Sequence, residues 1–458
     1  MFLAQTRSTM IRMRFLLASV VLLLTPGLGA QQLDPPRPVP VTPPAPPFPN
    51  RANEVLPSWL RVRGEFRERM EGFTGGGFTN ERDDLYWLSR FRFNATVTPT
   101  RLVSFSVQAQ DARVAKKSIG TTGTPFQGTF DLRAAFADIG DAKTRVAARV
   151  GRQELAYGEQ RLLGHLNWTN TARTFDAARL TIRSSRFQVD LLGGSVVRVL
   201  DSQFDKSGNG NRLVGAYGSS AAIVPRSTIE PYVFWKRDSD LRTERNTTDN
   251  LNLATIGVRW VGKLPRRIDY GTEMAVQTGS LDADNVQAWA GHWQLRAGAP
   301  TRVPLGLTGE YNYASGDADP TDGTRGTFDQ LYPTGHEKYG LADQVGWRNI
   351  HHLRTGVDVT PINALLLTAN YHSWWLAERN DALYSAGSAV IARAAGGAIS
   401  RHVGQEIDVQ ASRPITPQLQ VSGGYAYIFP GAFLKQATPG ASYGYPYVMA
   451  TYVFLADR

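Results

Sequence analysis

Arginine dominates the residues that could carry chemistry. The chain of 458 residues has 50 Lys and Arg against 40 Asp and Glu, for a formal net charge of +10, and only 8 of the 50 are Lys. A guanidinium is planar and permanently charged, and it binds carboxylate or phosphate through paired hydrogen bonds. A GC-rich genome would also favour Arg codons. Because the basic residues are scattered singly along a chain with an export signal, described below, we expect an anionic solute and no nucleic acid as partner.

Three aspartates and a set of histidines give weaker indications of metal chemistry. Asp317, Asp319 and Asp322 lie in a D-x-D-x-x-D-G run that resembles the start of a calcium loop. The spacing is not that of an EF-hand, and Asp and Gly are also common turn residues. His351 and His352 are adjacent on an expected strand and should face opposite ways. With His165, His336 and His372 in or near separate loops or strand ends, the histidines predict no zinc site.

The catalytic motifs of common enzyme classes are missing from the sequence. The chain has no Cys, which excludes thiolate catalysis, and it has no P-loop or G-x-S-x-G motif. His372 beside Ser373 is a poor hydrolase pair, because neighbours on a strand point to opposite faces. We therefore expect neither enzyme activity nor a cofactor.

The N-terminal segments look like an address and a spacer. Residues 1–30 combine three arginines, the apolar run FLLASVVLLL and small residues before position 30, which is the pattern of a signal peptide. Residues 31–57 are Pro-rich and are expected to form an extended spacer, or a ligand for a periplasmic partner. No later run of 18 apolar residues occurs. The remainder, residues 58–458, is then either an exported soluble protein or a transmembrane β-barrel.

From residue 59 onward, polar and apolar residues alternate with a period of two. In residues 60–69, Arg and Glu occupy the odd positions and Leu, Val, Gly and Phe the first even ones. The same alternation recurs over residues 90–97, 103–110, 305–313 and 419–429. A strand places the two sets on opposite faces. Because the polar face carries large charges of both signs, the pattern favours the water-filled lumen of an outer-membrane barrel over a soluble sandwich.

Aromatic residues and connection lengths support a barrel of about eighteen antiparallel strands. Many Trp and Tyr residues end the apolar faces, as an interfacial girdle requires; they include Trp59, Trp87, Tyr232, Trp235, Trp260, Trp289, Trp374, Tyr425 and Tyr452. Short turns are expected near 98–101, 140–143, 184–186, 224–227, 262–266, 298–302, 360–363 and 413–418. Longer loops are expected near 70–83, 113–127, 153–173, 198–211, 238–251, 279–285, 314–349, 377–401 and 430–444. Short periplasmic turns, long extracellular loops and two periplasmic termini follow.

Two stretches go beyond a generic barrel pattern. Residues 151–164 read GRQELAYGEQRLLG and continue as NWTNTARTFD at 167–176. The second stretch reads GEYNYASGD at 309–317, GTFDQLYP at 326–333 and GWRN at 346–349. Both resemble the alginate export family of outer-membrane proteins, over residues 59–454. The resemblance implies an eighteen-stranded barrel whose Arg-rich constriction passes an acidic polysaccharide out of the cell.

The register assigns particular charges to the lumen. The strand residues expected to line the pore or bind substrate are Arg63, Arg67, Arg90, Arg92, Arg149, Arg152 and Arg354. An eighteen-stranded barrel encloses an open channel unless a loop narrows it. We expect residues 151–176 to fold inward and place Arg152, Glu154, Arg161, Arg173 and Asp176 at the constriction. The alternatives are cross-strand charge pairs that only stiffen the wall, and an outer loop that meets lipopolysaccharide.

The sequence thus predicts a porin-like channel in the bacterial outer membrane, in contact with lipid and lipopolysaccharide. The leading hypothesis is passage of an acidic, alginate-like polysaccharide or another anionic solute. A general or organic-anion uptake porin with the same fold is the alternative. Rings of Arg and Lys select anions, whereas scattered acids keep binding weak enough for exit.

Overall fold

The structure is a computed structural model, and it describes residues 51–455 apart from 209, 243–246, 300 and 302. The predicted signal peptide, residues 1–30, lies outside the described residues, as do residues 31–50 of the predicted Pro-rich extension. No helix among the described residues combines the length and apolar character needed to span a membrane.

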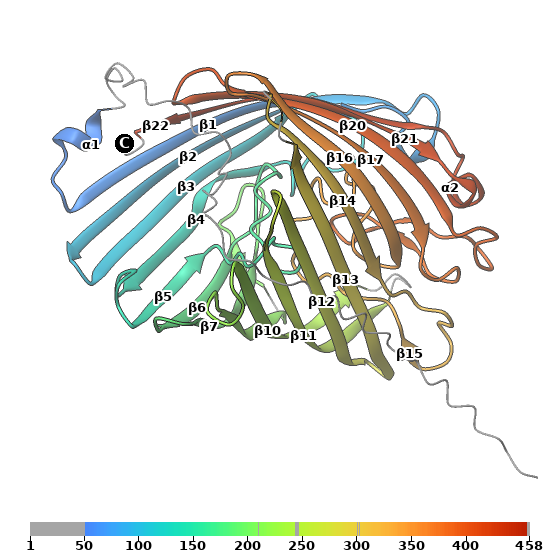
Figure 1. The fold of residues 1–458 in the computed structure, drawn as a ribbon, viewed down its shortest axis with the longest axis horizontal. Helices are drawn as coiled ribbons and strands as arrows, with labels where there is room; N and C mark the ends of the chain where they lie inside the picture. Colours follow the sequence, from blue (N-terminus) through green and yellow to red (C-terminus); the bar gives the residue numbers. More distant parts are fainter. Residues whose placement is uncertain (1–50, 209, 243–246, 300, 302, 456–458) are drawn as a thin grey trace, which may run out of the picture. The chain divides into compact units, whose positions relative to one another are not determined.

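Eighteen strands of 8 to 17 residues pair antiparallel with their chain neighbours and close into a ring. They are β1 Leu60–Phe73, β2 Asp84–Thr100, β3 Val103–Ala115, β4 Gly128–Ile139, β5 Val146–Gln153, β6 Phe175–Arg183, β7 Gln188–Arg198, β9 Arg212–Ser219, β10 Ser227–Arg242, β11 Thr248–Leu264, β12 Ile268–Leu281, β13 Asp284–Ala299, β14 Leu305–Ala314, β16 Ile350–Ile362, β17 Leu365–Leu376, β20 His402–Pro414, β21 Leu419–Pro430 and β22 Tyr443–Phe454. The ring closes because β1 pairs with both β2 and β22. In Figure 1, β1 lies between these two strands.

Short elements precede the first strand or occupy the connections between the strands. They are α1 Ala52–Val55, the 3-10 turn Gly76–Phe78, β8 Lys206–Ser207, β15 Thr324–Arg325, β18 Leu383–Tyr384, β19 Val390–Ala392 and α2 Ala432–Ala437. The side chain of Asn53 in α1 donates to the carbonyls of Val62 and Leu455, both at 2.7 Å. These two bonds tie α1 to the seam between the first and last strands.

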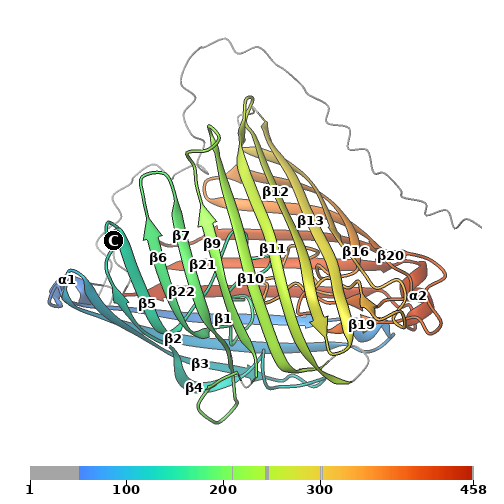
Figure 2. The same cartoon turned by 90° about the horizontal axis from the view of Figure 1, so that it is seen from below.

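The connections differ in length between the two ends of the ring. All eight predicted short turns are confirmed, and we call their end the turn end and the opposite one the loop end. The connections predicted near 279–285 and 238–251 occur there but are shorter than predicted: β12 ends at Leu281 and β13 begins at Asp284, while β10 reaches Arg242 and β11 begins at Thr248. The polar residues there belong to strand ends, because β10–β13 have 14 to 17 residues each and are longer than the strands on either side (Figure 2).

The predicted alternation of faces is confirmed along β2. Leu85 and Trp87 are 54% and 46% exposed, whereas Arg90 and Arg92 are 1% and 5% exposed. Successive side chains of a strand point to opposite faces. A belt of exposed large apolar side chains around the ring is what a lipid-facing surface requires, and the charged face is therefore the inner one.

The predicted aromatic girdle holds for most but not all of its members. Trp87, Trp235 and Tyr425 are 44% to 46% exposed on the outer face. Tyr232 and Trp374 are instead 5% and 1% exposed. Parity explains the first error, because Tyr232 and Trp235 are three residues apart in one strand and cannot share a face. Trp374 points inward, and its indole N–H donates to the carbonyl of Tyr339 in an inner loop at 2.9 Å.

The interior contains packed loops at the loop end. Residues 154–174, 315–349 and 377–401 contribute fully buried side chains, including Leu163, Phe328, Leu341 and Trp347, to one hydrophobic cluster with the strands. Burial of such side chains contributes roughly 1.5–3 kcal/mol each. The loops are therefore held in place by a core of their own, which an open cylinder would lack.

Candidate functional site: a loop-filled constriction

One loop crosses the lumen from wall to wall. Residues 154–174 connect β5 to β6, and we call them the crossing loop. The carbonyl of Asn167 accepts hydrogen bonds from Arg67 of β1 and Arg90 of β2, both at 3.0 Å. Arg161 of the same loop forms an ion pair at 3.0 Å with Glu310 of β14, elsewhere in the ring. These contacts support the hypothesis that this segment folds inward and narrows the channel.

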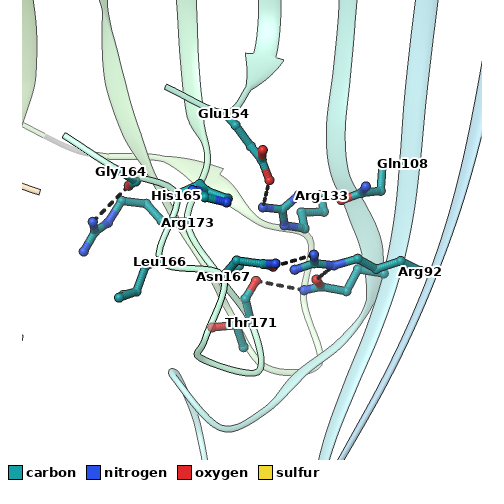
Figure 3. Close-up of polar contacts among 12 residues, drawn as sticks. Arg92, Gln108, Arg133, Glu154, Gly164, His165, Leu166, Asn167, Thr171 and Arg173 are labelled. Atoms are coloured by element: carbon teal, nitrogen blue, oxygen red, sulfur yellow. Dashed lines mark hydrogen bonds and ion pairs between the residues drawn. The ribbon is translucent and has the colours of Figure 1, made fainter. Parts of the chain in front are cut away.

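Four arginines of β1 and β2 hold one side of the crossing loop. We call Arg67, Arg69, Arg90 and Arg92 the arginine clamp; they are 1% to 5% exposed. Three of the four donate to backbone carbonyls in residues 167–169, at 2.7 to 3.3 Å. The fourth, Arg92, donates to the side-chain oxygen of Asn167 at 2.7 Å (Figure 3).

In the described part of the chain, carboxylates pair with only two of the four arginines of the clamp. Arg90 pairs with Glu65 at 2.5 Å and Arg69 with Glu71 at 2.8 Å. Arg67 and Arg92 are held by carbonyl and amide oxygens instead. Arg69 also lies 4.0 Å from the centroid of the Trp168 ring. The clamp therefore keeps excess positive charge, but the crossing loop covers it, so that a solute cannot touch these arginines directly in this conformation.

Next to the clamp, a charged pair faces the inside of the ring. Arg133 of β4 pairs with Glu154, the first residue of the crossing loop, at 2.5 Å. The Glu154 side chain is 41% exposed. Burial opposes its charge, but Arg133 lowers the pKa of Glu154 below its usual range. Glu154 and His165 lie on the inner side of the strands that carry Arg92 and Arg133 in Figure 3. An anionic Glu154 therefore stands next to the clamp on the accessible side.

Arg161 fixes the crossing loop to the opposite part of the ring. Its guanidinium is 3% exposed, and besides Glu310 it contacts Glu159 at 3.3 Å and the hydroxyl of Tyr339 at 3.3 Å. Arg354 of β16 approaches the other oxygen of Glu310 at 3.1 Å. Opposite charges buried together in this way depend on each other, because either one alone would be costly to desolvate. This cluster anchors the crossing loop to β14 and β16.

A second loop packs on the crossing loop. Residues 315–349, which we call the long loop, form backbone hydrogen bonds with it: Gly164 N–H to Tyr332 O at 2.9 Å and Tyr332 N–H to Leu162 O at 2.8 Å. The ring of His336 stacks on Trp168 with centroids 3.8 Å apart. Burial opposes the charge of His336, but nearby carboxylates, chiefly Asp343, outweigh it and raise the pKa to about 9. The stacked imidazole is therefore a cation at neutral pH.

A cavity of about 580 Å³ opens at the loop end of this constriction. Four cationic side chains line it, and Asp329 is the one carboxylate among its lining residues; the cations are Arg173, Lys236, Arg325 and Arg348. Lys236 pairs with Asp329 at 3.0 Å. Arg173 is held by carbonyls at 2.9 and 3.2 Å, and its burial lowers the pKa to about 10. Apolar residues also line it: Leu241, Leu251, Leu253 and Val286. They lie among the cations, since Leu253 pairs with Lys236 and Val286 with Arg325 in the strand register.

A second cavity, of about 340 Å³, lies at the turn end. Its cations are Arg101, Arg149, Arg179 and Arg183, and its acids are Asp138 and Asp141. Arg149 pairs with Asp138 at 2.7 Å, and both side chains are about a quarter exposed, at 28% and 25%. Arg63 is exposed on the face of β1 that carries Arg67. Cationic surface thus flanks the loop-filled zone at both ends.

Two predicted constriction residues are placed wrongly. Arg152 and Asp176 pair with each other at 2.8 Å, on the strand faces that also carry exposed Val150 and Leu180. These are the outer faces. Arg149 and Arg152 are three residues apart in β5, so only one of them can point inward. Arg152 and Asp176 are therefore not lumen residues.

The remaining predicted residues fall into three groups. Arg67, Arg90 and Arg92 belong to the covered clamp, while Arg161 and Arg354 belong to the buried cluster around Glu310. Side chains open to the lumen or to a cavity are those of Arg63, Arg149, Glu154 and Arg173. That these last four bind solute stays a prediction.

The aspartate run agrees with the turn alternative, whereas the histidines depart from expectation. Asp319 and Asp322 accept hydrogen bonds from the N–H groups of Thr321 and Thr324, as turn residues do, and among described residues they join no group of metal-ligand atoms. Three histidines of different strands do come together. His292, His352 and His372 lie in one hydrogen-bonded row along the inner wall, linked through Asn312 at 2.8 to 2.9 Å per step.

Sequence reasoning missed this row and the cations of the larger cavity. His292, His352 and His372 are 80 residues apart at their extremes, and only the register of β13, β14, β16 and β17 aligns them. Lys236, Asp329 and Arg348 come from one strand and one loop. The long charged loop at 314–349 was the signal available for the latter two.

Comparison with known proteins agrees with this geometry. A family model described as alginate export matches residues 58–447, most of the chain. No curated protein matches the sequence.

Solved structures share the fold at low sequence identity. OccK11 (OpdR) of Pseudomonas aeruginosa has a TM-score of 0.55 at 14% identity, over 86% of this chain and 96% of that one. OpdQ of the same organism has a TM-score of 0.58 at 11% identity, with 86% and 97% coverage. A BenF-like porin of Pseudomonas fluorescens has a TM-score of 0.57 at 12% identity, with 86% and 98% coverage. At such identities the likeness establishes the eighteen-stranded porin fold alone.

Proposed function

Since the chain belongs to the alginate export family and is an outer-membrane channel, we propose that it passes anionic solutes, with an acidic, alginate-like polysaccharide as the exported species. The solute would cross the constriction between the two cationic cavities. Transport across this membrane is passive, and any drive comes from synthesis or from a periplasmic partner. No covalent chemistry is part of the proposal.

The observation that carries the proposal is the charge of the loop-end cavity. Four cations face one carboxylate there, within a volume of about 580 Å³. In a channel with low-dielectric walls, such an excess raises the local concentration of anions. Arg173 and Arg348 have guanidinium groups that can hold a uronate carboxylate through two parallel hydrogen bonds.

Partial neutralisation allows the solute to leave. Lys236 is paired with Asp329, and at the turn end Arg149 is paired with Asp138. A channel conducts only if each site binds weakly enough to release its solute to the next. Cations that are partly paired with carboxylates therefore suit a polyanion that has to be bound and released in turn.

The apolar lining of the same cavity favours a second candidate. Leu241, Leu251, Leu253 and Val286 line the cavity together with the cations. A pocket lined by both cationic and apolar side chains suits an organic acid whose body is apolar, such as an aromatic carboxylate. In that case the chain would be an uptake porin for organic anions.

The proposed orientation follows from the lengths of the connections. β1 starts and β22 finishes at the turn end, where Gly64 pairs with Phe454. Outer-membrane barrels have short turns on the periplasmic side. We therefore propose that the start of β1 and the end of β22 lie on the periplasmic side, and that the loop-end cavity faces the outside.

The test is block of single-channel current in planar bilayers. An oligouronate should reduce the current in a concentration-dependent way, whereas a neutral oligosaccharide of equal length should not. In Arg173→Gln with Arg348→Gln, half-block should need at least about tenfold more oligouronate, since a charge-assisted hydrogen bond contributes about 1.5–3 kcal/mol.

Arg379→Gln is the matched control, because Arg379 is an exposed arginine of the loop end outside the cavity. It should leave the block unchanged. Equal block by charged and neutral sugars would refute anion recognition. If an aromatic carboxylate blocks at lower concentration than the uronates, and Leu251→Ala weakens only that block, the second candidate is the better one.

A further inference from the structure

Three ligand-type side chains meet on the inner wall between β17 and β20. His372 lies opposite Glu406 in the strand register, and Asp408 lies two residues further along β20. One ligand atom of each lies within 4.8 Å of the other two. All three side chains are 0% to 1% exposed. Among the described residues, no other group of three His, Asp or Glu side chains is this close.

The polar atoms that face one another in this group are short of partners. Glu406 accepts from the backbone N–H of Leu341 at 2.5 Å with one oxygen, while its Oε2 has no hydrogen-bond partner. His372 uses Nδ1 toward His352, and its Nε2 faces Asp408 Oδ2 at 2.9 Å. Buried polar atoms of native proteins nearly always have a partner, so an orphaned carboxylate oxygen needs an explanation.

The charges of the group are also unbalanced. Among described residues, no Lys or Arg forms an ion pair with Glu406 or Asp408, and Asp408 has Asn370 and His372 as its side-chain partners. Two buried carboxylates, with oxygens within 4.8 Å of each other, therefore lack a Lys or Arg partner in the part of the chain that the structure describes.

We propose that His372, Glu406 and Asp408 bind one divalent transition-metal ion, of the Zn²⁺ or Mn²⁺ type. Such an ion supplies the missing positive charge and takes a lone pair from each of His372 Nε2, Glu406 Oε2 and Asp408 Oδ2. An imidazole with two carboxylates is a ligand set suited to zinc and manganese, whereas calcium and magnesium prefer oxygen ligands alone. Three protein ligands leave a further position open.

The neighbours of His372 and Asp408 also fit metal binding. The other nitrogen of His372 is engaged by His352, which in turn contacts Asn312 at 2.9 Å. Metal-binding histidines usually have their second nitrogen held in this way, which fixes the tautomer and the ring orientation. Asn370 likewise orients Asp408 by donating to Oδ1 at 2.8 Å, which leaves Oδ2 for the ion.

The site would pin the long loop. Besides Leu341, the N–H of Ala342 also faces Glu406 Oε1, at 3.4 Å. Gly340 has φ +132° and packs so closely that a Cβ there would lie 2.9 Å from Glu406 Oε2. A metal that fixes Glu406 therefore fixes residues 340–342, which lie next to the His336 that stacks on Trp168 of the crossing loop. Metal occupancy would set how firmly the constriction is held.

The experiment uses the full-length, untagged barrel in detergent, treated with chelator and then titrated with Zn²⁺ or Mn²⁺ alone. We expect one ion per barrel by elemental analysis and by calorimetry. Glu406→Gln and His372→Gln should each weaken binding by more than about tenfold, because even the loss of a residue that only orients a metal ligand costs about 10–100-fold. His351→Gln is the matched control, because His351 is the outward-facing neighbour of His352. This variant should bind the metal ion as wild type does.

Hydrogen exchange supplies a second measurement, and mobility on unheated gels confirms that each variant folds. Zn²⁺ should slow exchange of the Leu341 and Ala342 amides in wild type but not in Glu406→Gln. If the ligand variants do not fold, Co²⁺ substitution of wild type should still give the visible spectrum of a site with nitrogen and oxygen ligands. No stoichiometric binding, or equal binding by wild type and Glu406→Gln, would overturn the proposal. Because the readouts are metal content and exchange, they do not depend on which solute the channel passes.

Discussion

Arg161→Met tests whether the crossing loop narrows the channel. Arg161 and Glu310 form a 3.0 Å ion pair with side chains 3% and 0% exposed. Removing one partner of a buried pair costs roughly 3–5 kcal/mol, because the remaining charge is left desolvated. Arg354 stays 3.1 Å from Glu310, which favours the lower value. About 3 kcal/mol corresponds to roughly a 150-fold shift toward conformations in which the loop has left the far wall.

The assay is single-channel conductance together with limited proteolysis of the folded barrel. Arg161→Met should show larger or fluctuating conductance steps, and cleavage within residues 154–174 should become faster. Arg413→Met is the matched control, since Arg413 is exposed near the turn end of β20. Adding Glu310→Gln to Arg161→Met should recover part of the loss, because the orphaned charge is then gone.

Unchanged conductance and unchanged cleavage in Arg161→Met would refute this reasoning. The reasoning would also be refuted if neither Arg161→Met nor Arg161→Met with Glu310→Gln assembled. The substitution would then act on folding of the ring and not on the position of the loop.

Two further predictions concern charge and pH. The cation His336 stacks on Trp168, and its raised pKa of about 9 means that this stabilising charge is fully present below about pH 6.5 and is lost as pH rises through about 9. Current fluctuations should therefore increase between pH 8 and about 10 in wild type, and His336→Gln should remove that pH dependence; a flat wild-type profile would contradict the assignment. Arg152→Met should leave ion selectivity unchanged, because its partner Asp176 and the pair itself lie on the outer face, and a selectivity change would restore Arg152 to the lumen.

The strands could be predicted from the sequence because lipid and water impose a period of two on every one of them. The turns were equally visible, since each is short and breaks the alternation. Residues an odd number of positions apart in one strand point to opposite faces. Arg149 and Arg152, or Tyr232 and Trp235, therefore cannot share a face. Gly151, with φ +123°, marks the point in β5 where the strand approaches the Phe136 backbone closely.

The contents of the lumen could not be predicted in the same way. The direction in which residues 154–174 fold depends on contacts with arginines far earlier in the chain, such as Arg67 and Arg90, which lie 100 and 77 residues before Asn167. Whether an arginine clamps a loop or meets a solute depends on what covers it, and the sequence pattern is the same in both cases. The row of His292, His352 and His372 depends on the stagger between strands, which turn positions alone do not fix.

The central claim is that the loop-filled channel prefers anions, and the most direct measurement is the reversal potential of the wild-type barrel in a planar bilayer under a KCl gradient. We expect a potential with the sign set by chloride, which moves toward zero when Arg173 and Arg348 are changed to Gln. A potential with the sign of potassium, or one that those two substitutions leave unaltered, would contradict it.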